Sequence, residues 1–83
     1  MNEYTRAHIR LSTPMECEKF VRLLNGDGSV YKYVLETGDG SFRVSARSYL
    51  GVVYFATEHN DSTYLVNVDA DGVYPNGIDN FRI

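Results

Sequence analysis

The segment TPMECEKFVRLLNG, residues 13–26, carries the clearest structural signal in this 83-residue chain. Thr13 suits an N-cap, Pro14 suits the first helical position, and Glu16 completes a capping box. Gly26 provides a stop signal. The apolar residues between these signals repeat at helical spacing and share one face: Cys17, Phe20, Val21 and Leu24. The segment therefore predicts an amphipathic helix with a buried structural thiol.

Four further segments predict strands. Apolar and polar residues alternate over residues 4–11, which indicates a half-buried strand. Residues 29–37 are rich in Val and Tyr, and the glycines of the turn 38–40 predict a hairpin with residues 41–46. A fourth strand is expected over residues 63–68. The inner side chains of the first strand are expected to be Thr5, Ala7, Ile9 and Leu11.

A second, shorter helix is expected to follow Ser48, which can cap it, and to run to about Thr57. Leu50, Val53 and Tyr54 are apolar there, and either Leu50 or Val53 must be buried if the helix is to be held.

The order strand, helix, strand, strand, short helix, strand and tail predicts an α+β fold. It suits an open-faced sandwich, in which two helices cover one face of a four-stranded antiparallel sheet. Eighty-three residues are enough for one domain, 1–83, with a small core.

The composition narrows the function classes. Eleven acidic and eight basic residues give a net charge of −3 without any Lys/Arg cluster, which argues against a nucleic-acid partner. Cys17 is the single cysteine, so an internal disulfide is excluded and a reducing compartment is expected. Residues 1–6 have no signal-peptide character, and no apolar run approaches the ~20 residues of a membrane helix. We therefore expect a cytoplasmic protein without a membrane partner.

Two strings carry a resemblance to a known family. EKFV, residues 18–21, is similar to the first-helix segment of the HPr phosphocarriers of the bacterial sugar phosphotransferase system. VSARSYLGV, residues 44–52, is similar to their strand-to-helix segment. The resemblance spans about residues 4–68 and implies an HPr-like open-faced sandwich. Turn residues within 69–83 predict that the family's third helix is missing or much reduced, which would leave sheet surface for the tail and a homodimer to cover.

The resemblance also shows what this chain lacks. Counting back from Phe20, the family's phosphate-accepting histidine falls on Thr13, its arginine on Met15 and its proline on Glu16. A phosphohistidine needs an imidazole nucleophile, and helix N–H groups and a cation to hold the phosphate. Glu16 instead adds negative charge. We therefore expect a degenerate phosphate site, no orthodox phosphocarrier activity and no enzymatic activity.

In Gram-positive members of the family, the serine that corresponds to Ser48 is phosphorylated by a dedicated kinase, and the product binds a transcription regulator. The resemblance implies the same class of protein partner here, with Tyr49, Leu50 and Val53 as the docking patch. A phosphate at a helix N-terminus is favoured by the helix dipole. The simpler alternatives are that Ser48 is only an N-cap and that part of the patch faces the core.

An alternative function is phosphotransfer through a non-standard acceptor, for which His8 and His59 are the histidines present. Neither has a second metal ligand at a recognisable spacing. Residues 67–72 are similar to the start of a calcium loop, but Ile78 stands where the closing glutamate is needed. We expect no metal site and no cofactor.

Overall fold

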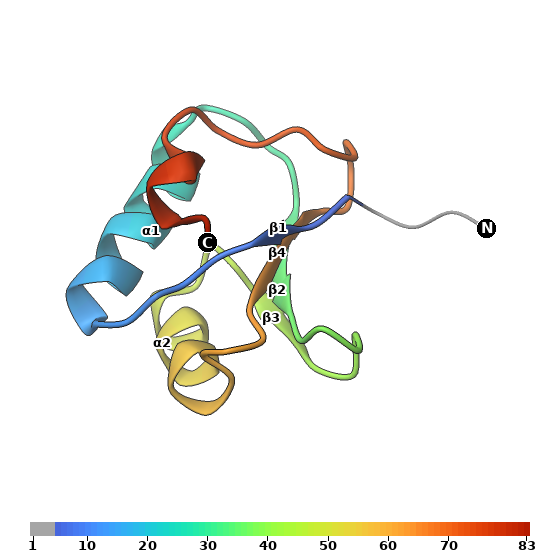
Figure 1. Ribbon diagram of the computed structural model, residues 1–83. Coiled ribbons are helices and arrows are strands. Elements are labelled where there is room, and N and C mark those ends of the chain that lie inside the picture. Colours follow the sequence, from blue (N-terminus) through green and yellow to red (C-terminus); the bar gives the residue numbers. More distant parts are fainter. Residues whose placement is uncertain (1–4) are drawn as a thin grey trace.

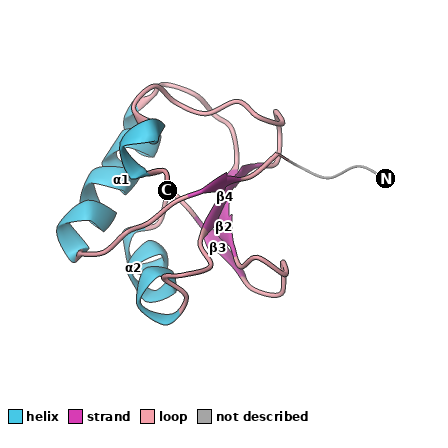
Figure 2. Cartoon of the chain, viewed as in Figure 1, coloured by secondary structure: helices cyan, strands magenta, loops and turns pink. Residues whose placement is uncertain are grey.

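The structure is a computed structural model that describes residues 5–83, so the predicted contribution of Tyr4 to the first strand lies outside the described residues. It confirms an α+β architecture in which the helices lie on one side of an open antiparallel sheet (Figures 1 and 2). The elements are β1 (Ala7–His8), α1 (Pro14–Gly26), β2 (Tyr33–Glu36), β3 (Arg43–Ser45), α2 (Tyr49–Glu58), β4 (Tyr64–Asn67) and the 3₁₀ turn η1 (Ile78–Phe81). Each strand is shorter than its predicted segment.

The strands are ordered β1-β4-β2-β3, so β4 lies in the middle of the sheet although it is last in the chain. Leu65 of β4 is opposite both Ala7 and Leu35, and Leu35 is also opposite Val44 of β3. Residues in register on neighbouring strands point to the same face. This row of apolar side chains is the floor on which the helices pack.

The core between sheet and helices uses the residues that periodicity predicts in both α1 and the first strand. Cys17, Phe20, Val21 and Leu24 are the buried residues of α1, and Ala7, Ile9 and Leu11 are buried in the first strand. Thr5 is exposed, contrary to prediction, because the strand is paired with β4 only from Ala7 onward.

Helix α2 packs with a different face from the one predicted. Its buried residues are Val52, Phe55 and Ala56, whereas Leu50 is 78% exposed and Val53 is only half-buried against the core. The prediction that Leu50 or Val53 anchors the helix is therefore wrong for Leu50 and only partly met by Val53. Val52 to Phe55 follows helical spacing as well as Leu50 to Val53 does, so the spacing of apolar residues alone could not choose the buried face.

Residues 69–83 form no third α-helix and contain only the 3₁₀ turn η1, as their turn residues predict. Ile78 is buried, and the ring of Phe81 meets that of Phe20 edge-on at 5.5 Å between centroids. Beyond η1 the chain pairs with the edge of the first strand, where Arg10 N donates to Phe81 O and Ile83 N donates to His8 O. The apolar residues that the described sheet turns toward the helices are thus covered within the chain. A homodimer remains a prediction, but the uncovered sheet face from which it was inferred is not present in the described residues.

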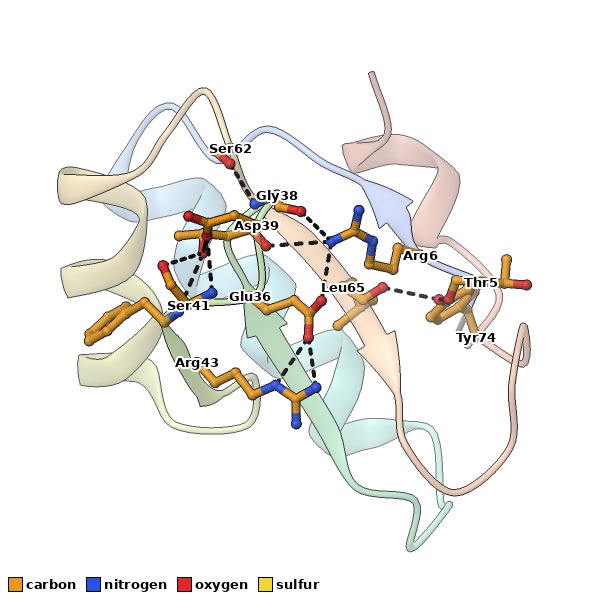
Figure 3. A network of polar contacts seen from close by, with 12 residues as sticks. Thr5, Arg6, Glu36, Gly38, Asp39, Ser41, Arg43, Ser62, Leu65 and Tyr74 are labelled. Atoms are coloured by element: carbon orange, nitrogen blue, oxygen red, sulfur yellow. Dashed lines mark hydrogen bonds and ion pairs between the residues drawn. The ribbon is translucent and has the colours of Figure 1, made fainter. Parts of the chain in front are cut away.

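On the face opposite the helices, a carboxylate lies between two guanidinium groups (Figure 3). The side chain of Glu36 is only 9% exposed, and its oxygens are 3.2 Å from Arg6 Nη1 and 3.0 Å from Arg43 Nη2. Arg6 also lies over the Tyr64 ring at 4.4 Å. Arg6 precedes β1, whereas Tyr64, Glu36 and Arg43 belong to β4, β2 and β3. Val34 and Val66, which are opposite each other in β2 and β4, are also buried.

In the hairpin turn before β3, the carboxyl group of Asp39 is more acidic than usual. Hydrogen bonds from Thr37 Oγ1 (2.7 Å) and Ser41 N (3.0 Å) lower the pKa of Asp39 from 3.8 to about 2 (Figure 3). Because the folded-state pKa is depressed, the carboxylate stabilises the turn above about pH 4, and this contribution is lost as the pH falls through about 2. A ¹³C NMR titration should place the Asp39 midpoint near pH 2. A midpoint near 3.8 would mean that the turn does not hold the carboxylate.

Candidate functional site

The N-terminus of α2 is capped by Ser48, as the sequence predicts. Ser48 has an extended backbone, and its Oγ accepts a hydrogen bond of 3.3 Å from Gly51 N. The residue is exposed. Its hydroxyl is therefore reachable from solvent and lies at the helix end where free N–H groups point, which is a favourable place for added negative charge.

Exposed apolar side chains extend along α2 from this cap. Leu50 has the largest exposed fraction, followed by Tyr54 at 55% and Tyr49 at 41%. The Phe42 ring, from the segment before β3, lies 6.1 Å from the Tyr54 ring. Sequence reasoning named Tyr49, Leu50 and Val53 but missed Phe42 and Tyr54. Tyr54 is four residues after Leu50, a spacing that puts both on one helix face, whereas Phe42 is brought there only by the tertiary fold.

At the N-terminus of α1, side-chain oxygens of the chain itself accept hydrogen bonds from backbone N–H groups. Thr13 Oγ1 accepts from Glu16 N at 3.1 Å, and the Glu16 carboxylate accepts from Ser12 N at 2.6 Å. This is a capping box, except that the returning carboxylate bonds to the residue before the cap. A phosphate at this helix end would have to displace Glu16 and overcome its charge.

A cavity of about 170 Å³ lies between the two helices. Thr13, Pro14 and Cys17 line it from α1, and Val53 and Ala56 line it from α2. The fold thus brings Thr13 and Val53, two residues singled out in the sequence, to one cavity. Met15, which is 61% exposed, lies outside the lining, as do Glu16, Ser48, Tyr49 and Leu50.

Burial raises the pKa of the Cys17 thiol, and the neighbouring Glu16 carboxylate adds to that rise. A thiol in this state is a poor nucleophile, because the thiolate is the reactive form. The structure confirms Cys17 as a buried side chain of the α1 stripe.

The two histidines lie elsewhere. The His8 ring stacks on Tyr64 at 4.5 Å on the face of the sheet opposite the helices. His59 follows α2 and packs against Phe42 and Phe55. Neither side chain lines the cavity beside Thr13.

The calcium-like string 67–72 forms turns. Asn67 Oδ1 accepts from the N–H groups of Asp69 and Ala70, and the Asp69 and Asp71 carboxylates accept from Lys32 N and Thr5 N. Across residues 5–83, no cluster of three or more His, Cys, Asp or Glu side chains is placed to hold a metal ion. Within the same residues, no helix combines the length and the apolar character needed to cross a membrane.

Comparison of the chain with models of protein families, with curated proteins and with solved structures found no match.

Proposed function

We propose that this chain is an HPr-like regulatory module that binds a protein partner and does not carry phosphate on histidine. The docking surface consists of Ser48, Tyr49, Leu50, Val53 and Tyr54, together with Phe42. The observation that carries the proposal is the run of exposed apolar side chains directly beside an exposed, N-capping Ser48. An apolar helix face left in solvent is a feature of interaction sites.

Phosphorylation of Ser48 is the regulatory step that we propose for this surface. A kinase would transfer the γ-phosphoryl group of ATP to Ser48 Oγ, with release of ADP and a proton. The new phosphate would meet the N–H groups of the first turn of α2, including Gly51 N. It would also add about two negative charges next to Tyr49 and Leu50. The partner that binds this surface is expected to be the kinase itself or a transcription regulator.

The site around Thr13 supports the same division of roles. Its hydroxyl already accepts the Glu16 N–H, and the Glu16 carboxylate occupies the position before the helix. A hydroxyl in that setting is already engaged as a hydrogen-bond acceptor, and the negative charge of Glu16 beside it opposes a phosphate. The alternative proposal, phosphotransfer through a non-standard acceptor, therefore has no favourable geometry at this helix end.

The test uses purified kinase of the HPr system with ATP. Wild-type protein should be labelled, Ser48→Ala should lose at least about 90% of the label, and the nearby control Ser45→Ala should keep it. Leu50→Ala should lower kcat/KM about 10-fold or more, because an exposed apolar anchor can supply over 1 kcal/mol of binding energy. Unchanged labelling of Ser48→Ala would remove this residue from the proposal.

A second assay separates the alternative function. Incubation with the first enzyme of the sugar phosphotransferase system and phosphoenolpyruvate should leave the protein unlabelled. Acid-labile phosphate on the chain would overturn the proposed loss of carrier activity and would point to His8 or His59.

A further inference from the structure

A second cavity lies at the opposite end of α1 from Thr13. Its volume is about 520 Å³, within the range of small-molecule sites. Leu23 and Asp27 line it from the end of α1, Tyr31 and Tyr33 line it from the segment entering β2, and Val73 and Tyr74 line it from the tail. None of these residues belongs to the docking surface proposed above.

Three tyrosine rings are held in place around this cavity. The Tyr31 and Tyr33 rings pack edge to face, at 83° with centroids 6.3 Å apart, and Tyr33 is only 2% exposed, so Tyr31 is the more accessible of the two. The Tyr33 hydroxyl donates to Asp27 at 3.3 Å, and the one proton of the Tyr74 hydroxyl lies between the carbonyl oxygens of Thr5 (2.7 Å) and Leu65 (3.0 Å; Figure 3). These bonds fix Tyr33 and Tyr74 before any ligand arrives, and Tyr31 packs against Tyr33, which lowers the entropy cost of binding.

Among the described residues 5–83, Asp27 is the only charged one in the lining. Burial raises the pKa of its carboxyl group, but hydrogen bonds from Ser29 and Tyr33 and the nearby Arg47 guanidinium outweigh this effect, so the net pKa is lowered. The C-terminal end of α1 adds negative partial charge, and its last turn contains no basic residue. The cavity therefore combines a carboxylate with aromatic faces.

The chain already places one cation against this aromatic cluster. The Arg47 guanidinium lies 5.0 Å from the centroid of the Tyr33 ring, yet Arg47 is not part of the cavity lining. Its N–H groups are directed to the carbonyl groups of Leu24, Ser29 and Tyr31. This arrangement holds Arg47 behind Tyr33, outside the lining, so no described lining residue is positively charged.

We propose that this cavity binds an organic cation that carries a methylated ammonium group. Tyrosine faces attract such a cation through their quadrupole, and rings arranged as a cage are a known solution for quaternary ammonium. Asp27 supplies the counter-charge. Leu23, Val73 and Pro75 offer apolar contact to methyl groups, which a strongly hydrated primary ammonium cannot use as well.

The test follows ¹H–¹⁵N NMR shifts during titration with choline and with 3,3-dimethyl-1-butanol, its neutral analogue of the same shape, at constant ionic strength. Choline should shift the amides of the lining residues and should bind at least about 10-fold more tightly than the neutral analogue. Equal affinities, or no binding by either compound, would overturn the proposal.

Variants locate the effect. Tyr31→Leu should weaken choline binding about 3- to 30-fold, the range expected for loss of one cation–π contact, whereas Tyr31→Phe should stay within about 3-fold of wild type. Asp27→Asn should also weaken it. Tyr54→Leu, on the far helix, is the matched control and should bind as wild type. Identical affinities for Tyr31→Leu and Tyr54→Leu would contradict the assignment.

A third arm identifies the source of the cation. A short peptide that contains trimethyl-lysine is compared with choline and tetramethylammonium. Tighter binding of the peptide would assign a methylated side chain, and tighter binding of choline would assign a free metabolite. Either result supports recognition of the methylated ammonium group.

Discussion

Replacing Phe55 by alanine should lower the free energy of unfolding by about 3–5 kcal/mol, the usual range for a fully buried aromatic side chain. Phe55 is 0% exposed, and its ring contacts those of Phe42 (5.9 Å between centroids) and His59 (5.1 Å). A domain of this size is expected to have only about 4–12 kcal/mol in total. The variant should therefore be near the edge of folding, as measured by urea denaturation followed by far-UV circular dichroism.

The neighbouring residue provides the control. Tyr54→Ala removes a ring of similar size that is mostly exposed, so the loss should be below about 1 kcal/mol. The pair tests which face of α2 is buried. Equal losses at the two positions would mean that Tyr54 is buried as well as Phe55, and the docking surface would then lose this residue.

The sequence was sufficient to predict an element where its capping residues and its apolar residues specify both its ends and its buried face. Thr13, Pro14 and Glu16 define the start of α1, and its apolar stripe leaves a single choice of buried face. Helix α2 has apolar residues around most of its circumference, so periodicity could not separate Val52 and Phe55 from Leu50 and Tyr54. The choice depends on β3 and the sheet below, which local spacing does not encode.

The same distinction applies to the sites. Ser48 could be located from its string, because an N-cap is a local feature. The cavity beside Thr13 and the tyrosine-lined cavity at the other end of α1 could not, since each is lined by residues from segments far apart in the chain. The tail supplies Tyr74 to the latter, and the turn signals in residues 69–83 gave no indication of where this ring would lie.

Arg47 gives the second large expected effect, and it changes the interpretation of the motif that contains it. In the string VSARSYLGV this residue is the basic neighbour of Ser48, and nothing in its local spacing predicts a structural role. In the structure its guanidinium is directed inward, where Nε and Nη2 donate to Tyr31 O at 3.1 and 2.8 Å and Nη2 bonds to Ser29 Oγ at 3.2 Å. It also donates to Leu24 O at the end of α1.

Arg47→Met should therefore lower the free energy of unfolding by about 2–3 kcal/mol, because several half-buried carbonyl groups lose their donor at once. Arg47→Lys should recover only part of this loss, since one ammonium group cannot span carbonyls that the planar guanidinium joins. The matched control is Arg22→Met, which removes an exposed i,i+4 ion pair with Glu18 and should change stability by less than about 0.5 kcal/mol.

Urea denaturation of the three variants distinguishes a structural from a recognition role for Arg47. If Arg47→Met unfolds like wild type while kinase labelling of Ser48 falls, the residue serves the partner and the inward hydrogen bonds are of little consequence. If stability falls as expected, Arg47 fixes the junction of α1, β2 and α2. Ser48 and the exposed face of α2 would then be positioned by the same guanidinium that lies against the Tyr33 ring. Its loss would disturb both proposed sites together, whereas Leu50→Ala and Tyr31→Leu should each disturb only one.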